Sequence, residues 1–243
     1  MPTHLILGGA RSGKSRHAEQ LAAASGLAVH VIVTAEALDD EMAARIARHQ
    51  ADRPAGWAVH EAPRNLATTL AVVAAPDRCV VVDCLTLWLA NLLDGAETLA
   101  PGADAGALPA FARERAALLA LIPQLPGPVI FVANEVGLGL VPESPLGRLF
   151  RDEAGRVNQA VATLCRRVSF VAAGLPLSFV PQEALPDGTA YEQFIGATGG
   201  VPATKDSSLH PVELVQFRQT LEASCAYYAA LRATTTSARI DRR

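Results

Sequence analysis

Near its start the chain carries the octapeptide GGARSGKS, residues 8–15, which matches the pattern G-x-x-x-x-G-K-[ST]. An apolar run at 4–7 suits a buried strand, and residues 15–24 have the apolar spacing of a helix. A strand, a glycine loop and a helix together make a phosphate-binding P-loop, because the loop N–H groups and the positive end of the helix dipole face the phosphates. The alternative is a glycine-rich turn that matches by chance, and the flanking strand and helix argue against it.

Three side chains are expected to act on the phosphates. In a P-loop, Lys14 would bridge the β- and γ-phosphates of a nucleoside triphosphate, and the Ser15 hydroxyl would hold Mg²⁺. Asp83 ends an apolar strand at 79–82, as the Walker-B aspartate does in P-loop enzymes, which predicts a second contact to Mg²⁺. The alternative for Asp83 is a cap on the helix that follows.

The rest of the chain predicts an α/β fold. Apolar, strand-like runs alternate with helix-like stretches, and these runs lie at 5–7, 28–33, 79–82, 129–132 and 168–172. This alternation predicts a mostly parallel sheet with helices on both faces, which is the three-layer P-loop NTPase fold of the RecA-like type. In such sheets ligands bind beyond the carboxyl ends of the strands.

We predict one kinase-like domain at 1–177 and a C-terminal extension at 178–243. The extension is rich in Pro, Gly, Ser and Thr, is expected to be partly flexible, and has a candidate helix at 212–232. Within the domain, a helix is expected at 149–167, and a solvated face explains most of its polar residues, which include Arg151, Asp152, Arg156 and Asn158.

Composition excludes several classes of partner. The net charge of −3 gives no reason to expect nucleic acid or an anionic membrane, and no apolar run approaches the roughly 20 residues of a membrane span. The four cysteines form no C-x-x-C pair, so core thiols in a reducing compartment are expected. The first strand starts almost at once and leaves no room for a signal peptide, which predicts a cytoplasmic protein.

His49 closes a helix-like segment that begins near Asp39. On this pattern alone, a histidine in a last turn is explained as a partner of the helix dipole or as a surface residue. The same ambiguity holds for Asn134 and Glu135, which lie beside Gly137 and Gly139 after an apolar strand. That stretch is either a shaped loop at the sheet edge or an ordinary glycine turn.

The motifs together resemble one family, the bifunctional adenosylcobinamide kinase/adenosylcobinamide-phosphate guanylyltransferases of cobalamin biosynthesis. The resemblance covers roughly residues 4–177 in unbroken order. Its segments are GGARSGKSR at 8–16, LDDEMAARI at 38–46, His49 with Arg53-Pro54, VDCLT at 82–86, NEVGLG at 134–139 and GRVNQ at 155–159.

The resemblance implies two reactions. A nucleoside triphosphate, ATP or GTP, phosphorylates the aminopropanol hydroxyl of adenosylcobinamide. GTP then donates GMP to that phosphate through a GMP–histidine intermediate, which gives adenosylcobinamide-GDP. Some members have two adjacent histidines before the Arg-Pro pair; here Arg48 stands first, which leaves His49 as the nucleophile. The family is described as a homotrimer.

The resemblance also implies a set of site residues. Lys14 and His49 are catalytic, Ser15 and Asp83 hold Mg²⁺, and Glu61 lies near the guanine, where a carboxylate can accept from N1–H and N2–H₂. Arg53 can neutralise phosphate charge. The implied nucleotide contacts are Gly8, Gly9, Ala10, Arg11, Ser12, Gly13, Lys14, Ser15, Val33, Thr34, Ala35, Gln50, Ala51, Asp52, Arg53, Glu61 and Asp83.

One geometric demand follows from these roles. A P-loop presents the β- and γ-phosphates, whereas guanylyl transfer needs attack at the α-phosphate. His49 must therefore reach the α-phosphate of GTP held at Lys14, either by movement of its own helix or from a neighbouring subunit. Two other functions fit parts of the pattern: a kinase for another small metabolite, which would not need His49, and a nucleotide-dependent switch ATPase.

Overall fold

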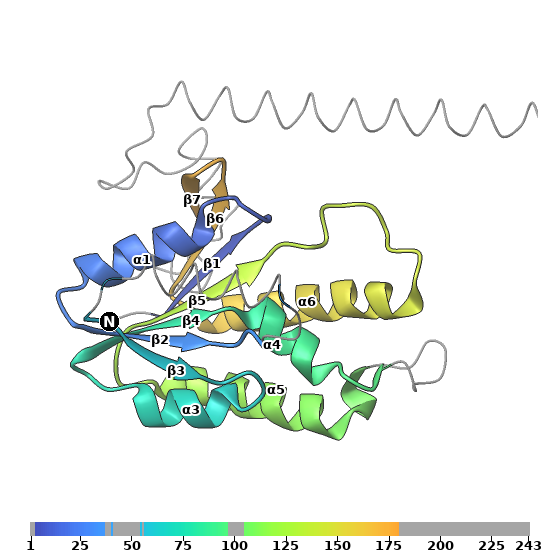
Figure 1. Cartoon of the computed structure of the whole chain (residues 1–243), viewed down its shortest axis with the longest axis horizontal. Helices are drawn as coiled ribbons and strands as arrows, with labels where there is room; N and C mark the ends of the chain where they lie inside the picture. The colour runs from blue at the N-terminus through green and yellow to red at the C-terminus, as the bar shows by residue number, and fades with distance from the viewer. Residues whose placement is uncertain (1–2, 37–39, 41–53, 55, 97–104, 180–243) are drawn as a thin grey trace, which may run out of the picture. The chain divides into compact units, whose positions relative to one another are not determined.

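The computed structural model describes residues 3–36, 40, 54, 56–96 and 105–179. They belong to one compact unit, Met1–Gly188, and form a seven-stranded sheet with the order β3-β2-β4-β5-β1-β6-β7 (Figure 1). All neighbouring strands are parallel except β6 and β7, which are antiparallel. The strands are β1 (His4–Gly8), β2 (Ala28–Val33), β3 (Ala58–Glu61), β4 (Arg78–Asp83), β5 (Val129–Asn134), β6 (Arg167–Ala172) and β7 (Leu175–Phe179).

Helices cover both faces of the sheet. In Figure 1, α1 lies on one side of the strands, and α3 and α5 lie on the other. The helices are α1 (Lys14–Ala24), α3 (Leu66–Val73), α4 (Leu85–Leu92), α5 (Pro109–Leu121) and α6 (Pro145–Leu164), with short 3-10 turns η2 (Ala105–Ala107) and η3 (Ile122–Gln124). The predicted three-layer α/β fold is confirmed.

The central residues of strand β4 are all apolar because both faces of the strand are covered. Val80 and Val82 point into a core shared with α3, α4, α5 and α6, whereas Cys79 and Val81 point into a second core shared with α1. Alternate residues of a strand face opposite sides, so a strand covered on both sides must be apolar at every position.

The P-loop strand lies inside the sheet, not at its edge. Strand β1 is hydrogen-bonded to β5 and β6, and β5 separates it from β4, which ends at Asp83. One additional strand between the P-loop strand and the Walker-B strand is the RecA-like arrangement, as predicted.

The last strand, β7, was not expected. We predicted that the chain would leave the sheet near residues 174–177, but Ala173 and Gly174, with φ of 52° and 81°, reverse it into β7. Pro176 and a left-handed alanine are unusual signals for a hairpin, and proline is tolerated here because β7 is the edge strand. Residues 178 and 179, which we assigned to the extension, complete this strand, and the candidate helix at 212–232 lies outside the described residues.

Candidate active site

The P-loop residues form a tight turn at the start of α1. Ser12 N–H donates to the Gly9 carbonyl at 3.2 Å, and Arg11 and Gly13 both have positive φ, 57° and 95°. Gly13 precedes Lys14, the first residue of α1, so the loop leads directly into a helix N-terminus. Unpaired N–H groups at such an end bind anions, which makes this loop a phosphate site.

Two glycines of the loop have no room for a side chain. A Cβ on Gly8 would lie 2.5 Å from Ser12 Oγ and 2.6 Å from the Val171 carbonyl oxygen. A Cβ on Gly13 would lie 3.1 Å from the Cα of Gly174, whose N–H donates to the Ser12 carbonyl at 2.8 Å. The turn between β6 and β7 therefore supports the phosphate loop from outside.

Lys14 and Asp83 share one electrostatic environment. The Nζ of Lys14 donates to the Gly9 carbonyl at 3.2 Å, which folds the side chain back over the loop. Burial raises the pKa of the Cys84 thiol to about 11; the neighbouring Asp83 carboxylate adds to this rise, and the Lys14 ammonium opposes it. Lys14 and Asp83 are therefore both close enough to the Cys84 thiol to affect its pKa.

Strand alternation and register place the predicted carboxylates on the P-loop side of the sheet. Val81 packs in the core beneath α1, and Asp83, two residues further, faces the same side. Val33 is in register with both Asp83 and Glu61, so Glu61 also faces that side, at an exposed position. Glu61 and Asp83 therefore lie along the same edge as the P-loop.

The donors at this edge fit Mg²⁺. Magnesium prefers hard oxygen ligands and is commonly held by one or two protein oxygens together with phosphates and water. The Ser15 hydroxyl in the first turn of α1 and the Asp83 carboxylate supply such oxygens. Among the described residues there is no cluster of three or more His, Cys, Asp or Glu side chains that would hold a metal without a nucleotide.

Thr34 holds β2 to β4 just beyond the sheet. Its side chain is fully buried, its Oγ1 donates to the Cys84 carbonyl at 2.6 Å, and Cys84 N–H donates back to Oγ1 at 2.9 Å. Thr34 N–H also donates to the Asp83 carbonyl at 3.1 Å. We expected Thr34 at a strand end near the nucleotide; it lies directly after β2, and the oxygen of its side chain is engaged by Cys84. Its contact with the nucleotide stays a prediction.

Asn134 lies at the end of β5, in register with Gly8 of the P-loop. Its N–H donates to Thr86 Oγ1 at 2.7 Å, and its carbonyl accepts from Asn158 Nδ2 at 3.5 Å. Its own side-chain oxygen is buried and finds no hydrogen-bond partner among the described residues. The next residue, Glu135, donates its N–H to the Gly8 carbonyl at 3.0 Å, which ties this loop to the phosphate loop.

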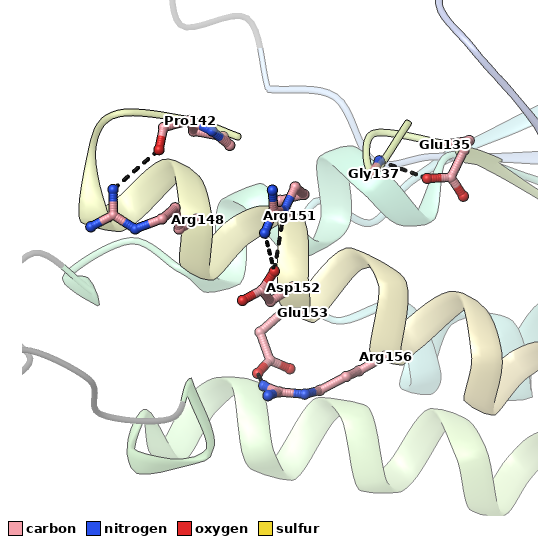
Figure 2. Close-up of polar contacts among 8 residues, drawn as sticks. All are labelled: Glu135, Gly137, Pro142, Arg148, Arg151, Asp152, Glu153 and Arg156. Carbon is pink, nitrogen blue, oxygen red and sulfur yellow. Dashed lines mark hydrogen bonds and ion pairs between the residues drawn. The ribbon is translucent and has the colours of Figure 1, made fainter. Parts of the chain in front are cut away.

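The loop after β5 is therefore shaped, which resolves an ambiguity left by the sequence. Glu135 Oε1 accepts from Gly137 N–H at 2.6 Å, so the carboxylate closes the first turn of the loop (Figure 2). At the far end, Arg148 donates to the Pro142 carbonyl at 3.1 Å and to the Glu143 carbonyl at 2.6 Å.

Comparison with known proteins places these features in one family. Residues 4–179 match the model of the family described as cobinamide kinase / cobinamide phosphate guanyltransferase. The bifunctional adenosylcobalamin biosynthesis protein CobP of Pseudomonas aeruginosa is 54% identical over 175 residues, which are 71% of this chain and 94% of that protein. The chain belongs to this family.

Two more relatives agree with this assignment. The bifunctional adenosylcobalamin biosynthesis proteins CobU of Salmonella typhimurium and Escherichia coli are 44% and 42% identical, each over 70% of this chain and 96% of the relative. This cobinamide kinase / cobinamide phosphate guanyltransferase family member thus covers nearly the whole length of its relatives. No helix in the described part of the chain has the length and apolar character needed to cross a membrane.

The site residues of the family member divide into two groups. The P-loop, residues 33–35, Glu61 and Asp83 are described and share the carboxyl edge of the sheet. His49 and the predicted contacts Gln50, Ala51, Asp52 and Arg53 lie outside the described residues. Their segment begins just after Glu36, which forms an ion pair with Arg64 at 3.3 Å at this same edge.

Three buried polar residues at this edge were missed as parts of the site: Asn91, Thr86 and Asn158, with exposures of 9%, 7% and 8%. From the sequence we expected no role in the site for Asn91 or Thr86, and we expected a solvated face to explain most polar residues of the helix that contains Asn158. That explanation is wrong for Asn158, because it faces the end of β5. All three are polar residues on the side of a helix that packs against the core, close to the end of a strand. A polar residue in such a position is the sequence signal that could have identified them.

Helix α6 also holds an ion pair in which one partner is buried. Glu153 is buried and forms an ion pair with Arg156, one helical turn away (Figure 2). In contrast, Arg151 and Asp152 pair at 3.0 Å with the carboxylate half-exposed, as on an ordinary helix surface. The helix thus carries one structural ion pair and one surface pair.

Proposed function

We propose that this chain phosphorylates adenosylcobinamide with ATP or GTP and then transfers GMP from GTP to the resulting phosphate, giving adenosylcobinamide-GDP and pyrophosphate. The observation that carries this proposal is a complete P-loop beside Asp83 in a chain that belongs to the cobinamide kinase / guanyltransferase family. The 54% identity to a protein named as bifunctional in adenosylcobalamin biosynthesis supports both activities.

The kinase step uses the described edge. The loop N–H groups and Lys14 hold the β- and γ-phosphates, and Ser15 and Asp83 would hold Mg²⁺, which would neutralise charge on the phosphates. The substrate hydroxyl oxygen forms a bond to the γ-phosphorus, the bond from that phosphorus to the bridging oxygen breaks, and the hydroxyl proton is released. The nucleoside diphosphate leaves with the bonding electrons.

The guanylyl step uses His49 as a nucleophile. A neutral imidazole nitrogen attacks the α-phosphorus of GTP and pyrophosphate leaves, which forms a phosphoramidate bond to GMP. A phosphate oxygen of adenosylcobinamide phosphate then attacks the same phosphorus and frees His49. Glu61 accepts from the guanine N1–H and N2–H₂, and residues 50–53 complete the contacts, with Arg53 beside the phosphates.

The covalent intermediate provides the direct test of the guanylyl step. The protein is incubated with Mg²⁺ and GTP labelled at the α-phosphate, denatured, and examined for bound label. We expect label that is acid-labile, base-stable and absent from His49→Ala. If no label forms while cobinamide is still phosphorylated, the chain is a kinase alone, and His49 is an ordinary helix end.

His49 can reach the nucleotide bound to its own subunit or the one bound to a neighbouring subunit. We propose a homotrimer in which His49 acts from its own chain or from a neighbour. Co-expressed Lys14→Ala and His49→Ala subunits, each inactive in guanylyl transfer, distinguish the two cases. Recovered activity in the mixed oligomer requires at least one site in which His49 and Lys14 come from different chains. No recovery, with mixed oligomers verified by mass, places both in one chain.

We further propose that the reactions take place in the cytoplasm with a small-molecule corrinoid as acceptor. Cys79, Cys84 and Cys165 are free, buried thiols, which suits a reducing compartment. Burial also raises the pKa of the Cys165 thiol to about 12, so it stays protonated and unreactive at neutral pH.

A further inference from the structure

Asn91 connects two loops at the carboxyl edge of the sheet. It lies in the last turn of α4 and is 9% exposed. Its Nδ2 donates to the Thr34 carbonyl at 2.8 Å and to the Pro63 carbonyl at 2.9 Å. A side-chain amide nitrogen carries two hydrogens, so this single group uses one on the loop after β2 and the other on the loop after β3.

The link reinforces one that the sheet itself provides. Ala62 N–H donates to the Val33 carbonyl at 2.9 Å, which joins the last residue of β2 to the first residue after β3. Asn91 joins the same two segments just beyond the strands, at Thr34, one residue after β2, and at Pro63, two residues after β3. Because Thr34 is also bonded to Cys84, the loops after β2, β3 and β4 are fixed to one another.

The position of these linked loops should affect binding of the nucleotide base more than binding of its phosphates. Glu61 lies two residues before Pro63 and is exposed at the edge. The P-loop belongs to β1 and α1, is separated from β2 by β4 and β5, and is supported by Gly174. A shift of the loop after β3 would therefore move Glu61 and leave the phosphate cradle in place.

Guanine and adenine differ in what they offer a carboxylate. Guanine presents N1–H and N2–H₂ as donors, and adenine has neither of these donors at the corresponding positions. The donor and acceptor of an N–H···O hydrogen bond usually lie about 2.7–3.2 Å apart. A displacement of about 1 Å at Glu61 is enough to abolish the guanine contact, while triphosphate binding at the P-loop is common to both nucleotides.

We propose that Asn91 is a positioning residue for guanine: by holding the loops after β2 and β3 together, it keeps Glu61 where it can accept from the base. The inference rests on the proposed function, since it takes Glu61 as the group that reads guanine. It predicts that Asn91 controls the preference for GTP over ATP and not the ability to bind a triphosphate.

The test measures the dissociation constants of GTP and ATP, with Mg²⁺, for the full chain by calorimetry. We expect Asn91→Ala to weaken GTP about tenfold and ATP less than about twofold. Asn91→Asp should weaken GTP further, because a carboxylate would face two carbonyl oxygens without a hydrogen to donate. Asn91→Ser keeps one hydrogen-bond donor, so we expect a ratio of GTP to ATP affinity between those of the parent and Asn91→Ala. This variant replaces Asn91→Ala in the test if Asn91→Ala fails to fold.

Two further variants serve as controls for the ratio of the GTP and ATP dissociation constants. Ser169→Ala removes another buried polar group, which is 2% exposed and hydrogen-bonded to His4 at 2.8 Å, in β6, which is separated from β2 by β4, β5 and β1. It measures what a lost buried hydrogen bond does to the ratio, and we expect no change. Glu61→Gln should reproduce the loss of GTP preference, because an amide mismatches one guanine donor.

Each outcome decides the matter. If Asn91→Ala weakens GTP and ATP equally, or weakens neither, Asn91 is a structural residue and the proposal is wrong. If Glu61→Gln leaves the ratio unchanged, Glu61 does not read guanine and the proposal fails for that reason. Phosphorylation of cobinamide, measured with ATP, tests the proposed kinase function separately from either result.

Discussion

Thr34 and Cys84 exchange two hydrogen bonds through a single hydroxyl: Thr34 Oγ1 donates to the Cys84 carbonyl at 2.6 Å and accepts from the Cys84 N–H at 2.9 Å. Both residues are buried, so water has little access to replace either bond. The contact satisfies the backbone just after Asp83, at the point where β4 ends and α4 begins. The position of the predicted metal ligand thus depends on a residue from another strand.

Replacing the hydroxyl tests this dependence. Thr34→Val has nearly the same shape but leaves the Cys84 N–H unpaired and leaves the Cys84 carbonyl with only the Trp88 N–H as a donor, so we expect a loss of about 1–3 kcal/mol in the free energy of unfolding. Thr34→Ser should retain most of the stability. Urea denaturation gives the values, and Thr68→Val on the exposed side of α3 is the matched control, expected within about 0.5 kcal/mol of the parent. A similar small effect at Thr34 would contradict the assigned role.

Gly8→Ala should abolish triphosphate binding. The new methyl group would lie 2.6 Å from the Val171 carbonyl oxygen, and this backbone atom cannot move aside without displacing β6. Gly155→Ala is the matched control, because a Cβ there meets nothing within 4 Å and the position is inside α6. That control should keep binding and gain up to about 1 kcal/mol in stability. Calorimetry with ATP and thermal unfolding of both variants provide the measurements.

His4 should make the fold sensitive to acid. Burial, and then the charges of His17 and Arg167, lower the pKa of His4 from 6.5 to about 4. Between these two values the unfolded chain binds a proton that the folded chain does not, so stability is lost as the pH falls from about 6.5 to about 4, by up to about 3 kcal/mol. Above pH 6.5 this contribution is constant.

The measurement is the free energy of unfolding against pH for the parent and for His4→Gln. The variant has no titrating group at this position, so its curve should be flatter over the acid range even if its stability is lower throughout. Parallel curves for the two proteins would show that His4 is not responsible for the acid sensitivity.

The buried carboxylate of α6 should depend on its arginine. Arg156→Ala leaves Glu153, which is 2% exposed, without this charged partner, so we expect a loss of about 1–3 kcal/mol. Adding Glu153→Leu to that variant should restore part of the loss, because the unpaired charge is gone. For comparison, Asp152→Ala breaks the half-exposed pair with Arg151 and should cost less than about 0.5 kcal/mol. If the stability change of the double variant equals the sum of the changes of the two single variants, Glu153 and Arg156 are not coupled.

The sequence predicts the layers of this fold well because its strands are covered on both faces. Cys79 and Val80 point into different cores, and this is why their strand appears as an unbroken apolar run. The P-loop was predictable because its glycines and Lys14 form a short local motif that can be recognised in the sequence, although its support by Gly174 comes from a distant segment.

Contacts between distant segments were not predictable in this way. Asn91 bonds Thr34 and Pro63, and nothing in the sequence around Asn91 identifies either partner. Strand β7 was missed because a positive φ at Ala173 is rare for a residue with a side chain, and Pro176 normally opposes pairing. Tertiary contacts, in particular the Gly174 N–H bonded to the Ser12 carbonyl, stabilise that turn.

The place of β1 in the sheet has a consequence for how the protein is made. The phosphate-binding motif is synthesised before both strands that flank β1 and before the glycine that supports Ser12. A nascent chain that stops before Gly174 carries the complete motif but lacks this support. We therefore expect such a chain to bind ATP and GTP more weakly than the folded domain does.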